Sequence, residues 1–496
     1  MKATQKIAFA ITAVSILSLG ETFGQSGYFE DILRYSQSRS NGSARVTAIG
    51  GAQTSLGGDV SNIHSNPAGL GFFRRSEFSL TGSYGSWATE TTFMDQIQEN
   101  NTSNFAVPNL SVVMSKVKDP LEAGDWRGGS FGISINRSQL FTNDFNYFSN
   151  SRGSSSLLDY YTEDYNDFGE PAVGDALGLP LDVGLIIDNN GTFEKDPDYA
   201  VGNPFQDEFI ETEGTLSQIT FAYGGNYKNK VFLGGSVGVT SVNFQSTKTF
   251  NEEFLDENDL NALYYSLQEN LLQSGTGVNV NLGVIYKPLD NINLGLSFSS
   301  PTWTRINEEF DADIFAEFYD LNGTLESEDE AVSDRYLTPI NMRSPMKFSV
   351  GGTYFFNKNG FITADADFID YSSMNLSSPD FSLDASNSDI KTFATSTINF
   401  RGGAEYRLDI FRLRAGAAIY GDPMQDSDLD REMIQYSGGI GVRLPKFYVD
   451  FSLIQNSYKS FYYSYPQSTG TSYEGPDRAD TSNKQLTGLL TVGFNF

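Results

Sequence analysis

SARVTAIGGAQTSLGGDVSNIHSNPAGL, residues Ser43–Leu70, is the stretch that decides the fold. It is rich in Gly and Ala, it ends in an Asn-Pro-Ala-Gly turn, and it shows no strand alternation. Directly after it the pattern changes to short alternating strands that continue to the last residue. A compact segment of small residues ahead of a long β chain is typical of a plug followed by a barrel.

The composition favours strands and excludes several classes of function. Charged residues make up 19%, aromatic residues 14%, and there are 48 Gly, which suits many strands and turns. The absence of Cys excludes a disulfide framework, a thiolate zinc site and a thiol nucleophile. A net charge of −29 excludes binding to nucleic-acid phosphates as a main role, because that needs basic stripes.

Residues 1–24 read as a secretory signal peptide. Lys2 and Lys6 precede the apolar run Ile7–Leu19, and Thr22-Phe23-Gly24 is a small-residue cleavage site before Gln25. No later apolar run reaches the ~18 residues that a transmembrane helix needs. We therefore predict an exported protein of the outer membrane of a Gram-negative bacterium, which crosses the bilayer with strands.

After the signal peptide we predict two parts, an N-terminal hatch over residues 25–75 and a barrel over residues 76–496. Near the start of the hatch, Phe29, Ile32, Leu33 and Ser36 share one face at helical spacing. This spacing predicts a short amphipathic helix within residues 28–40. A frayed mature N-terminus is an equally open interpretation.

The barrel prediction depends on hairpins such as Val278–Ser299, in which apolar residues alternate with Asn, Gly and Ser. That pattern is typical of transmembrane strands with one face toward lipid and one toward a polar lumen. Fourteen strands are expected, starting near residues 77, 107, 129, 216, 230, 277, 291, 345, 360, 392, 410, 434, 446 and 485. Short periplasmic turns alternate with long extracellular loops, notably 143–214, 250–275 and 309–342. The last strand, Leu486–Phe496, ends on an aromatic residue and must close the barrel against the first.

Two of the long loops are acidic. Glu308–Glu330 and Glu252–Asp259 each hold many carboxylates, for which a solvated surface is favoured over a divalent-cation site. Apolar residues between Phe254 and Leu272 recur three and four apart and predict an amphipathic helix over the barrel mouth. Such a helix would pack over the mouth, offer a first hydrophobic landing site, or do both.

Alternation assigns a set of charged residues to the lumen, since charges that face lipid are costly. They are Lys347, Asp365, Asp367, Arg401, Glu405, Arg412, Arg414, Arg443 and Asp450. Two interpretations stay open: a lattice of salt bridges that holds the plug, which is favoured, or an Arg that receives a substrate carboxylate.

His64 is the only histidine, and no Gly-x-Ser-x-Gly motif accompanies it. One His leaves little for a catalytic triad, for haem or for a metal. Beside the Asn-Pro turn it is expected to make local hydrogen bonds. The sequence therefore predicts no enzyme, no cofactor and no metal.

The run Gly50-Gly51-Ala52, Asp59-Val60-Ser61 and Asn66-Pro67-Ala68-Gly69-Leu70 resembles the hatch of the FadL/TodX family of outer-membrane transporters. The likeness continues through Gly277–Pro288, Asn293–Phe298, Gly351–Tyr354, Asp370–Ser373, Phe411–Gly416 and Asp422-Pro423. The resemblance implies a fourteen-stranded barrel with a hatch in its lumen. It also implies passive uptake of long-chain fatty acids or aromatic hydrocarbons through a side opening near a distorted third strand.

In this chain the third strand is Ser130–Leu140, which Arg137-Ser138 interrupts. Asn66, Pro67, Ala68 and Gly69 are the candidate gate residues of the hatch. Expected partners are outer-membrane lipid, lipopolysaccharide and a hydrophobic small molecule, with no nucleic acid, and the chain is expected to be a monomer.

The alternative function is an attachment component of a type IX secretion system, which some barrels of this superfamily resemble. A continuous apolar path from loop 250–275 to the hatch would favour the transporter, whereas an attachment barrel needs only exposed loops. An open polar porin is disfavoured because the hatch would block it.

Overall fold

The computed structural model describes residues 27–37, 39, 41–119, 121–122, 124–255, 261–425, 429–466 and 475–496. The predicted signal peptide, residues 1–24, lies outside the described residues. Within the described part, no helix is long and apolar enough to span a bilayer.

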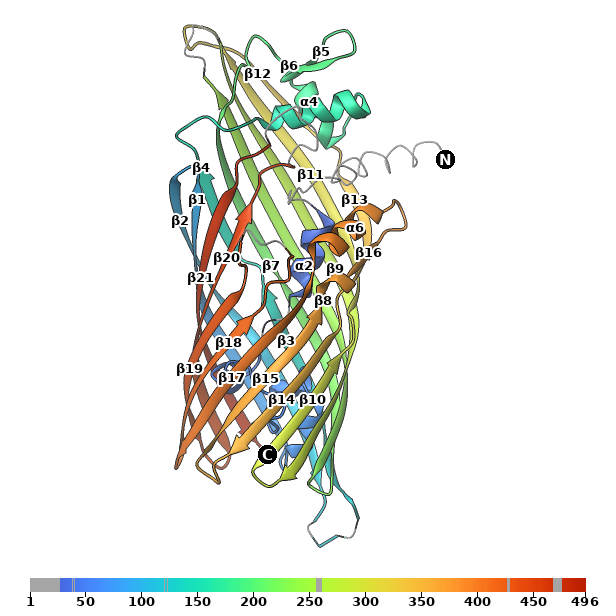
Figure 1. The fold of residues 1–496 in the computed structure, drawn as a ribbon, viewed down its shortest axis with the longest axis vertical. Coiled ribbons are helices and arrows are strands. Elements are labelled where there is room, and N and C mark those ends of the chain that lie inside the picture. The colour runs from blue at the N-terminus through green and yellow to red at the C-terminus, as the bar shows by residue number, and fades with distance from the viewer. Residues whose placement is uncertain are drawn as a thin grey trace.

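Fourteen antiparallel strands form a closed barrel (Figure 1), which confirms the predicted fold class and strand number. The barrel closes where β21 pairs with β1, with Phe494 opposite Phe78. Its strands are β1 (Glu77–Phe93), β2 (Gln96–Val117), β3 (Trp126–Leu140), β7 (Phe205–Tyr227), β8 (Val231–Phe254), β9 (Ala262–Leu289), β10 (Ile292–Ser299), β14 (Lys347–Phe355), β15 (Gly360–Asp370), β17 (Ser396–Leu408), β18 (Phe411–Tyr420), β19 (Met433–Arg443), β20 (Phe447–Tyr462) and β21 (Ala479–Asn495).

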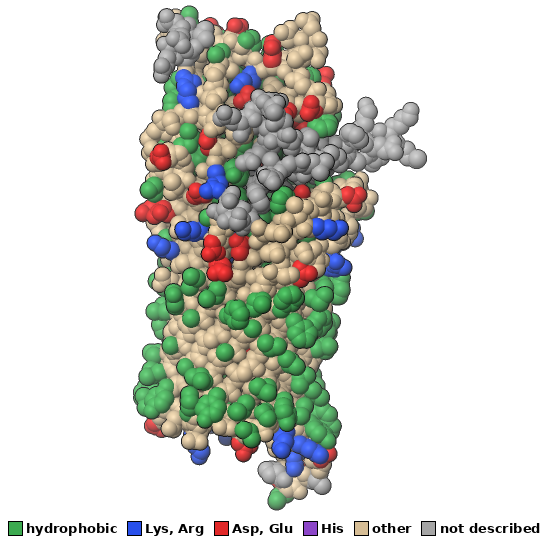
Figure 2. Space-filling model, viewed as in Figure 1, with side chains coloured by type: hydrophobic (Ala, Val, Ile, Leu, Met, Phe, Trp, Pro, Cys, Tyr) green, Lys and Arg blue, Asp and Glu red, His purple; other side chains and the backbone are tan. Residues whose placement is uncertain are grey.

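Apolar side chains point outward along these strands. In β10, Leu294 and Leu296 are each 49% exposed, while the alternate residues Asn293 and Ser297 are 1% and 7% exposed. Figure 2 shows the result on one face as a belt of hydrophobic side chains across the lower half of the barrel, with charged side chains above it. An apolar exterior around a polar lumen is what a bilayer requires of a barrel.

The expected tight turns lie at the end of the barrel below this belt. Lys228 and Asn229 join β7 to β8 with positive φ, and Asp409 does the same between β17 and β18. Short turns with left-handed residues are the usual two-residue hairpin connections. We call this end periplasmic and the opposite end extracellular.

Two of the three predicted extracellular loops, 250–275 and 309–342, are largely strand in their described residues, which corrects the sequence analysis. β7, β8 and β9 run far above the belt, where β9 pairs with β11 (Trp303–Tyr319), which in turn pairs with β12 (Leu325–Val332) and β13 (Tyr336–Arg343). The helix predicted within residues 254–272 is wrong, because the described residues there belong to β8 and β9. Their apolar residues, Phe254, Leu263, Tyr265 and Leu267, point inward at period two.

Those inward side chains pack against a cap formed by residues 149–204. The cap follows β4 (Asn143–Phe148) and holds α4 (Leu157–Phe168), η3 (Ala176–Gly178), α5 (Leu179–Asp182), β5 (Ile186–Asp188) and β6 (Phe193–Lys195). Buried Glu252 of β8 fixes it, accepting hydrogen bonds from Ser156 Oγ and, at 2.9 Å, from Leu157 N at the start of α4. The cap therefore covers the tall side of the barrel mouth.

The expected hatch, residues 25–75, divides into two separate parts. The predicted helix is confirmed as α2 (Tyr28–Ser36), but it lies in the barrel mouth beside η4 (Tyr371–Ser373), β16 (Asn375–Ser377) and α6 (Asp384–Phe393). The compact part, Ser43–Phe73, lies lower in the lumen and contains α3 (Ala44–Thr47), η1 (Val60–Ile63) and η2 (Pro67–Phe72). From here on, "hatch" means Ser43–Phe73. The described residues between the two parts, Gln37, Arg39, Asn41 and Gly42, are called the strap.

Candidate functional site

The hatch touches the barrel wall backbone to backbone. A Cβ on Gly416 would lie 2.2 Å from Gly50 N, and one on Gly403 would lie 2.4 Å from Ile49 O. Contacts this close leave no room for a Cβ atom. Glycine is therefore required at these positions because the hatch main chain lies so close to the wall, and not because of its backbone flexibility. Three more wall glycines meet the hatch main chain in the same way: Gly224, Gly234 and Gly295. The lumen is therefore sealed at this level by interlocked main chain.

The four candidate gate residues anchor the hatch to the wall. Asn66 Nδ2 donates hydrogen bonds to Thr54 O (2.6 Å) and to Leu296 O (3.2 Å) of β10, and Asn66 Oδ1 accepts from Ala68 N (3.1 Å). Pro67, Ala68 and Gly69 follow in η2, where Asn66 is the N-cap and all three are buried. Asn-Pro at a helix start is a favoured capping sequence. Their role as a gate stays a prediction.

Most of the predicted luminal charges form ion pairs between neighbouring wall strands, and the hatch contacts this network. Arg414 bridges Glu405 (2.9 Å) and Asp450 (2.7 Å), and Asp450 also pairs with Arg443 (2.9 Å). The hatch enters this network through Arg45, which lies 3.5 Å from Glu405.

A second group lies on the neighbouring strands. Arg401 pairs with Asp367 (2.7 Å), and Asp365 accepts a hydrogen bond from hatch residue Thr54 N (2.8 Å). Lys347 lies close enough to Asp367 for their charges to interact. Arg412 differs: its guanidinium binds the carbonyls of Asp409 and Phe411 at the periplasmic rim, and it joins no ion pair among the described residues.

Removing the carboxylate at the centre of the first network should loosen the hatch. In Glu405→Gln, Arg414 and Arg45 lose a buried counter-charge, and breaking a buried pair on one side costs about 3–5 kcal/mol. We expect the variant to unfold at a clearly lower temperature when the shift from folded to unfolded mobility is followed by gel electrophoresis. Glu326→Gln on exposed β12 makes the same chemical change and should leave the transition unchanged. Equal transitions for both variants would contradict the role of the network.

The His64 ring lies beside Asn41 and Gly42. An added Cβ on Gly42 would lie 3.6 Å from His64 Cε1. Its local hydrogen-bonding role stays a prediction.

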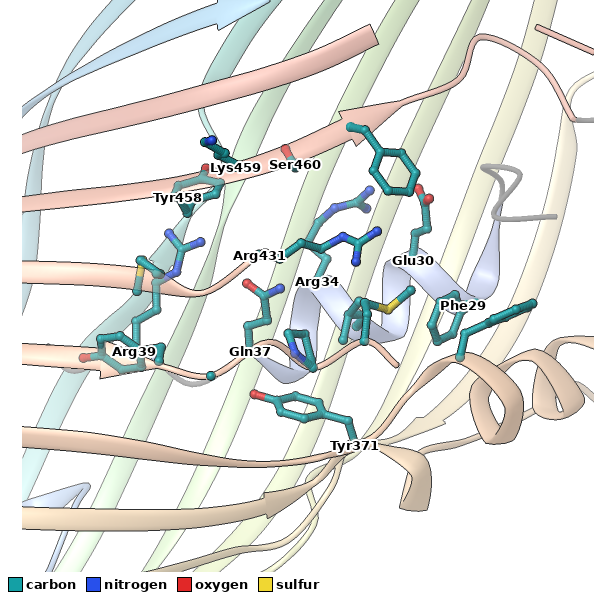
Figure 3. Close-up of a pocket in the computed structure, with 18 of the residues that line it drawn as sticks. Phe29, Glu30, Arg34, Gln37, Arg39, Tyr371, Arg431, Tyr458, Lys459 and Ser460 are labelled. Atoms are coloured by element: carbon teal, nitrogen blue, oxygen red, sulfur yellow. The ribbon is translucent and has the colours of Figure 1, made fainter. Parts of the chain in front are cut away.

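A cavity of about 430 Å³ lies at the extracellular end of the barrel, between α2 and strands β18–β20 (Figure 3). Its lining combines aromatic side chains with cations. The Arg39 guanidinium stands 5.4 Å from the ring centroid of Tyr458, and that of Arg431 stands 4.6 Å from that of Phe461. Further lining residues are Phe29, Leu33, Arg34, Tyr371, Phe393 and Met433. The cavity therefore suits an apolar molecule, and the cations in its lining suit a negatively charged end.

The other face of α2 is hydrogen-bonded to β9 and β11 through a set of polar side chains that we call the latch cluster: Tyr28, Asp31, Tyr35, Gln273 and Glu308. Gln273 Nε2 of β9 donates to Asp31 Oδ2 of α2 (2.5 Å) and to Glu308 Oε2 of β11 (2.7 Å). Tyr28 OH donates to Glu308 Oε1 (3.3 Å), and Tyr35 OH donates to the side-chain oxygen of Gln273, Oε1. Gln273, Asp31 and Glu308 are all buried, so the latch cluster holds α2 through directional bonds that are shielded from water.

Glu308 makes the latch cluster sensitive to pH. It lies above the belt, and burial, with Asp31 nearby, raises its pKa from 4.5 to about 7. Because the docked carboxyl binds its proton more tightly, docking of α2 is strongest below about pH 4.5 and weakens as the pH rises through 7.

Hydrogen exchange of the α2 amides should show this dependence. Protection, corrected for intrinsic exchange rates, should fall as the pH is raised from 5 to 8, by a factor of order ten per unit of pKa shift. In Glu308→Gln the amide cannot titrate, so protection should stay flat over the same range. A wild-type protection that does not change with pH would contradict the assignment.

The barrel wall has a break in its hydrogen-bond ladder between the extracellular parts of β2 and β3, beside α2, and we call it the wall break. β2 pairs with β3 only from Asn109 to Val117, while the extracellular part of β2 pairs with β1 alone. Pro108, which lacks an N–H donor, lies where that pairing stops, and the β1–β2 register shifts there. On the other side of the break, β3 shifts register against β7 between Arg137 and Gln139. The distortion expected at Arg137-Ser138 is thereby confirmed.

Two contacts surround the wall break, one with β4 on its extracellular side and one with the strap on the inside of the barrel. Above it, Thr102 Oγ1 donates to Asp144 Oδ2 (3.2 Å) and ties β2 to β4. From inside, the strap lies against β3: Asn41 Nδ2 donates to Arg137 O (3.0 Å), and Asn136 Nδ2 donates to Asn41 Oδ1 (3.0 Å). The strap therefore backs the wall break.

Aromatic rings connect α2 to the wall break. Tyr35 of α2 lies 5.6 Å from Phe141 and 6.4 Å from Phe244, and these two rings lie 5.6 Å apart. Tyr35, Phe141 and cavity residue Leu33 are partly buried and pack against one apolar cluster, which contains Tyr371 of the cavity. Apolar surface thus runs from the cavity, past α2, to the wall break.

Sequence reasoning missed the cavity and the latch cluster. Gln273 and Glu308 sat in segments interpreted as long loops, so the hydrogen bond of Gln273 to Asp31, 242 residues away in sequence, gave no signal. A signal for the wall break existed in Pro108, because Pro inside an otherwise alternating strand marks an edge or a bulge.

No family of known proteins matches the sequence, and no curated protein matches it. Solved structures do. A FadL homologue from Pseudomonas aeruginosa is 13% identical, with a TM-score of 0.57, over 93% of this chain and 100% of that one. The toluene transporter TodX of P. putida is 15% identical, with a TM-score of 0.50, over 92% and 99%. At these identities the likeness shows a shared fold, a barrel of FadL/TodX type.

Proposed function

We propose that this chain, with its FadL/TodX-type fold, is an outer-membrane channel for the passive uptake of hydrophobic molecules. The observation that carries the proposal is the apolar surface that runs from the extracellular cavity past α2 to the wall break. The path anticipated from the sequence was to end at the hatch. Here it ends at the wall instead, and the hatch below is sealed by main-chain contacts.

The route has an entrance on the low side of the mouth. β18 ends at Tyr420 and β19 begins at Met433, and both residues line the cavity, whereas the tall side is covered by the cap. A hydrophobic molecule that binds there leaves water for an aromatic surface, which is favourable by roughly 25 cal/mol per Å² of apolar area.

The exit is sideways, into the bilayer. Below the level of α2 the inward-facing residues are polar, such as Asn279, Asn281 and Ser297, and offer an apolar molecule no favourable site. The wall break instead leads from the aromatic rings to the lipid-facing surface, where Phe105 is 72% exposed. Lateral diffusion then follows apolar surface throughout.

In this proposal α2 is the gate. The apolar cluster around it is packed, with Ile32 only 1% exposed, so the route opens only when α2 shifts. The latch cluster holds it in the closed position, and the strap transmits a shift of α2 to the wall break through Asn41.

The substrate class is tested by uptake. A strain that lacks the gene should lose accumulation of a labelled long-chain fatty acid or of toluene, and the intact gene should restore it. A variant that removes the cavity cations, Arg39→Met with Arg431→Met, should lose fatty-acid uptake but keep toluene uptake if a cation binds the carboxylate. Unchanged accumulation of both compounds in the deletion strain would refute the channel. No contact among the described residues favours the type IX secretion alternative, which we do not propose.

A further inference from the structure

Above the belt, one part of the outer wall carries an unbalanced positive charge. Arg305 of β11 and Arg343 of β13 both point outward and are exposed. Arg305 is paired with Asn341, and Trp303 with Arg343, so the two arginines are diagonal neighbours across the strand pair. Diagonal neighbours lie ~7–8 Å apart, a distance at which two guanidinium groups can share one anion.

Neither arginine has a counter-charge in the part of the chain that the structure describes. Arg343 Nη2 donates only to the carbonyl of Ser373 (3.0 Å). The next outward carboxylate up β11, Glu309, pairs with Arg335 instead (3.8 Å). In a chain with 62 acidic and 33 basic residues, two adjacent cations without an acidic partner indicate that an anion is supplied from outside.

The surroundings of this pair are layered along the membrane normal. Toward the belt, the lipid-facing residues Val278, Trp303 and Phe348 are 50%, 51% and 49% exposed, with Trp303 directly opposite Arg343. Toward the extracellular end, the outward residues Ser274 and Asn307 are neutral and polar, as is Asn341 directly opposite Arg305. Acyl chains, phosphate and sugar follow in the same order in a lipopolysaccharide molecule standing in the outer leaflet.

We propose that Arg305 and Arg343 bind the phosphate groups of lipid A, the acylated anchor of lipopolysaccharide. Arg is suited to this because its planar guanidinium binds phosphate with two hydrogen bonds. The proposal goes beyond the transported substrate and rests only on the placement of the belt in the outer membrane.

The test uses the full-length mature chain purified in detergent, with hexa-acylated bis-phosphorylated lipid A as the probe and native mass spectrometry as the readout. R305Q/R343Q should bind the probe roughly tenfold or more weakly, since each basic group at a membrane surface contributes measurably to attraction of anionic lipid. R305K/R343K should recover part of the affinity, because it keeps the charge but loses the bidentate geometry. K230Q/K287Q at the periplasmic end removes the same charge and should bind as wild type does.

The proposal would be overturned if R305Q/R343Q bound lipid A as tightly as wild type does, or if wild type bound fully dephosphorylated lipid A as tightly as the phosphorylated form. A loss of affinity in K230Q/K287Q as large as in R305Q/R343Q would also overturn it. Phosphatidylglycerol is added as a competitor. Displacement of lipid A by an equimolar amount would show a general anionic surface and would also refute the assignment. Folding of each variant is checked by its heat-dependent gel mobility.

Discussion

A disulfide between the strap and β3 is expected to stop uptake reversibly. Asn41 and Asn136 lie on the inner side of the wall break with their side-chain amides 3.0 Å apart. In N41C/N136C, oxidation ties the strap to β3, so α2 cannot shift and the apolar route stays closed. Uptake of the labelled hydrophobic compound should fall to the level of the deletion strain and return on reduction. The wild-type chain has no Cys, so no other disulfide interferes.

The control is a second cysteine pair that should form without consequence. Asn456 and Gln485 face each other across β20 and β21 and are already joined by a side-chain hydrogen bond of 3.1 Å. N456C/Q485C therefore crosslinks two strands that do not move relative to one another. Full uptake in oxidised N41C/N136C would show that the strap need not move and would refute α2 as the gate.

A methyl group on the wall where the hatch touches it should open a polar leak. In Gly416→Ala the added Cβ would lie 2.2 Å from Gly50 N and 2.7 Å from Ile49 Cα, both main-chain atoms that cannot turn aside. Overpacking of this kind costs about 1–3 kcal/mol, and the hatch must move to relieve it. We expect a lower unfolding temperature together with a rise in single-channel conductance and in sensitivity to small hydrophilic antibiotics.

Gly352→Ala on β14 is the matched control, because an added Cβ there has open space. It should leave stability, conductance and antibiotic sensitivity as in the wild type. A Gly416→Ala barrel that stays as stable and as impermeable as the wild type would show that the hatch adjusts without loss of its seal.

The periplasmic half of the molecule was predictable because the bilayer imposes one rule on it. A lipid-facing residue must be apolar and its neighbour may be polar, so the turns after Tyr227, Leu289 and Leu408 could be located to within a few residues. The same rule fixed the closing strand, since an open edge is not tolerated in lipid.

The extracellular half obeyed no such rule. Above the belt, β8 and β9 carry polar residues outward and a mixture of apolar and polar residues inward, where the cap covers them. The alternation of apolar and polar residues along the strand is then hidden, and inward residues such as Leu263 and Leu267, four apart, have the spacing expected of a helix. The strand starts expected near 216 and 277 lie at Phe205 and Ala262 for this reason.

The candidate site was predictable only where a local signal existed. Alternation alone identified Arg414, Glu405 and Asp450 as luminal, and the structure brings them together. The latch cluster instead depends on a single Gln that reaches two carboxylates from different elements. Such a contact is set by the barrel's register, which no stretch of sequence records.

The most direct test of the account is photo-crosslinking with a diazirine-bearing hydrocarbon during uptake, followed by mass spectrometry of the labelled peptides. The account predicts labelling of the cavity at Phe29 and Phe393, then of Phe141 and the β2 residues beside the wall break, with the hatch unlabelled. Labelling of hatch residues such as Asn66 and Pro67, with none beside the wall break, would contradict lateral exit and show passage through the hatch.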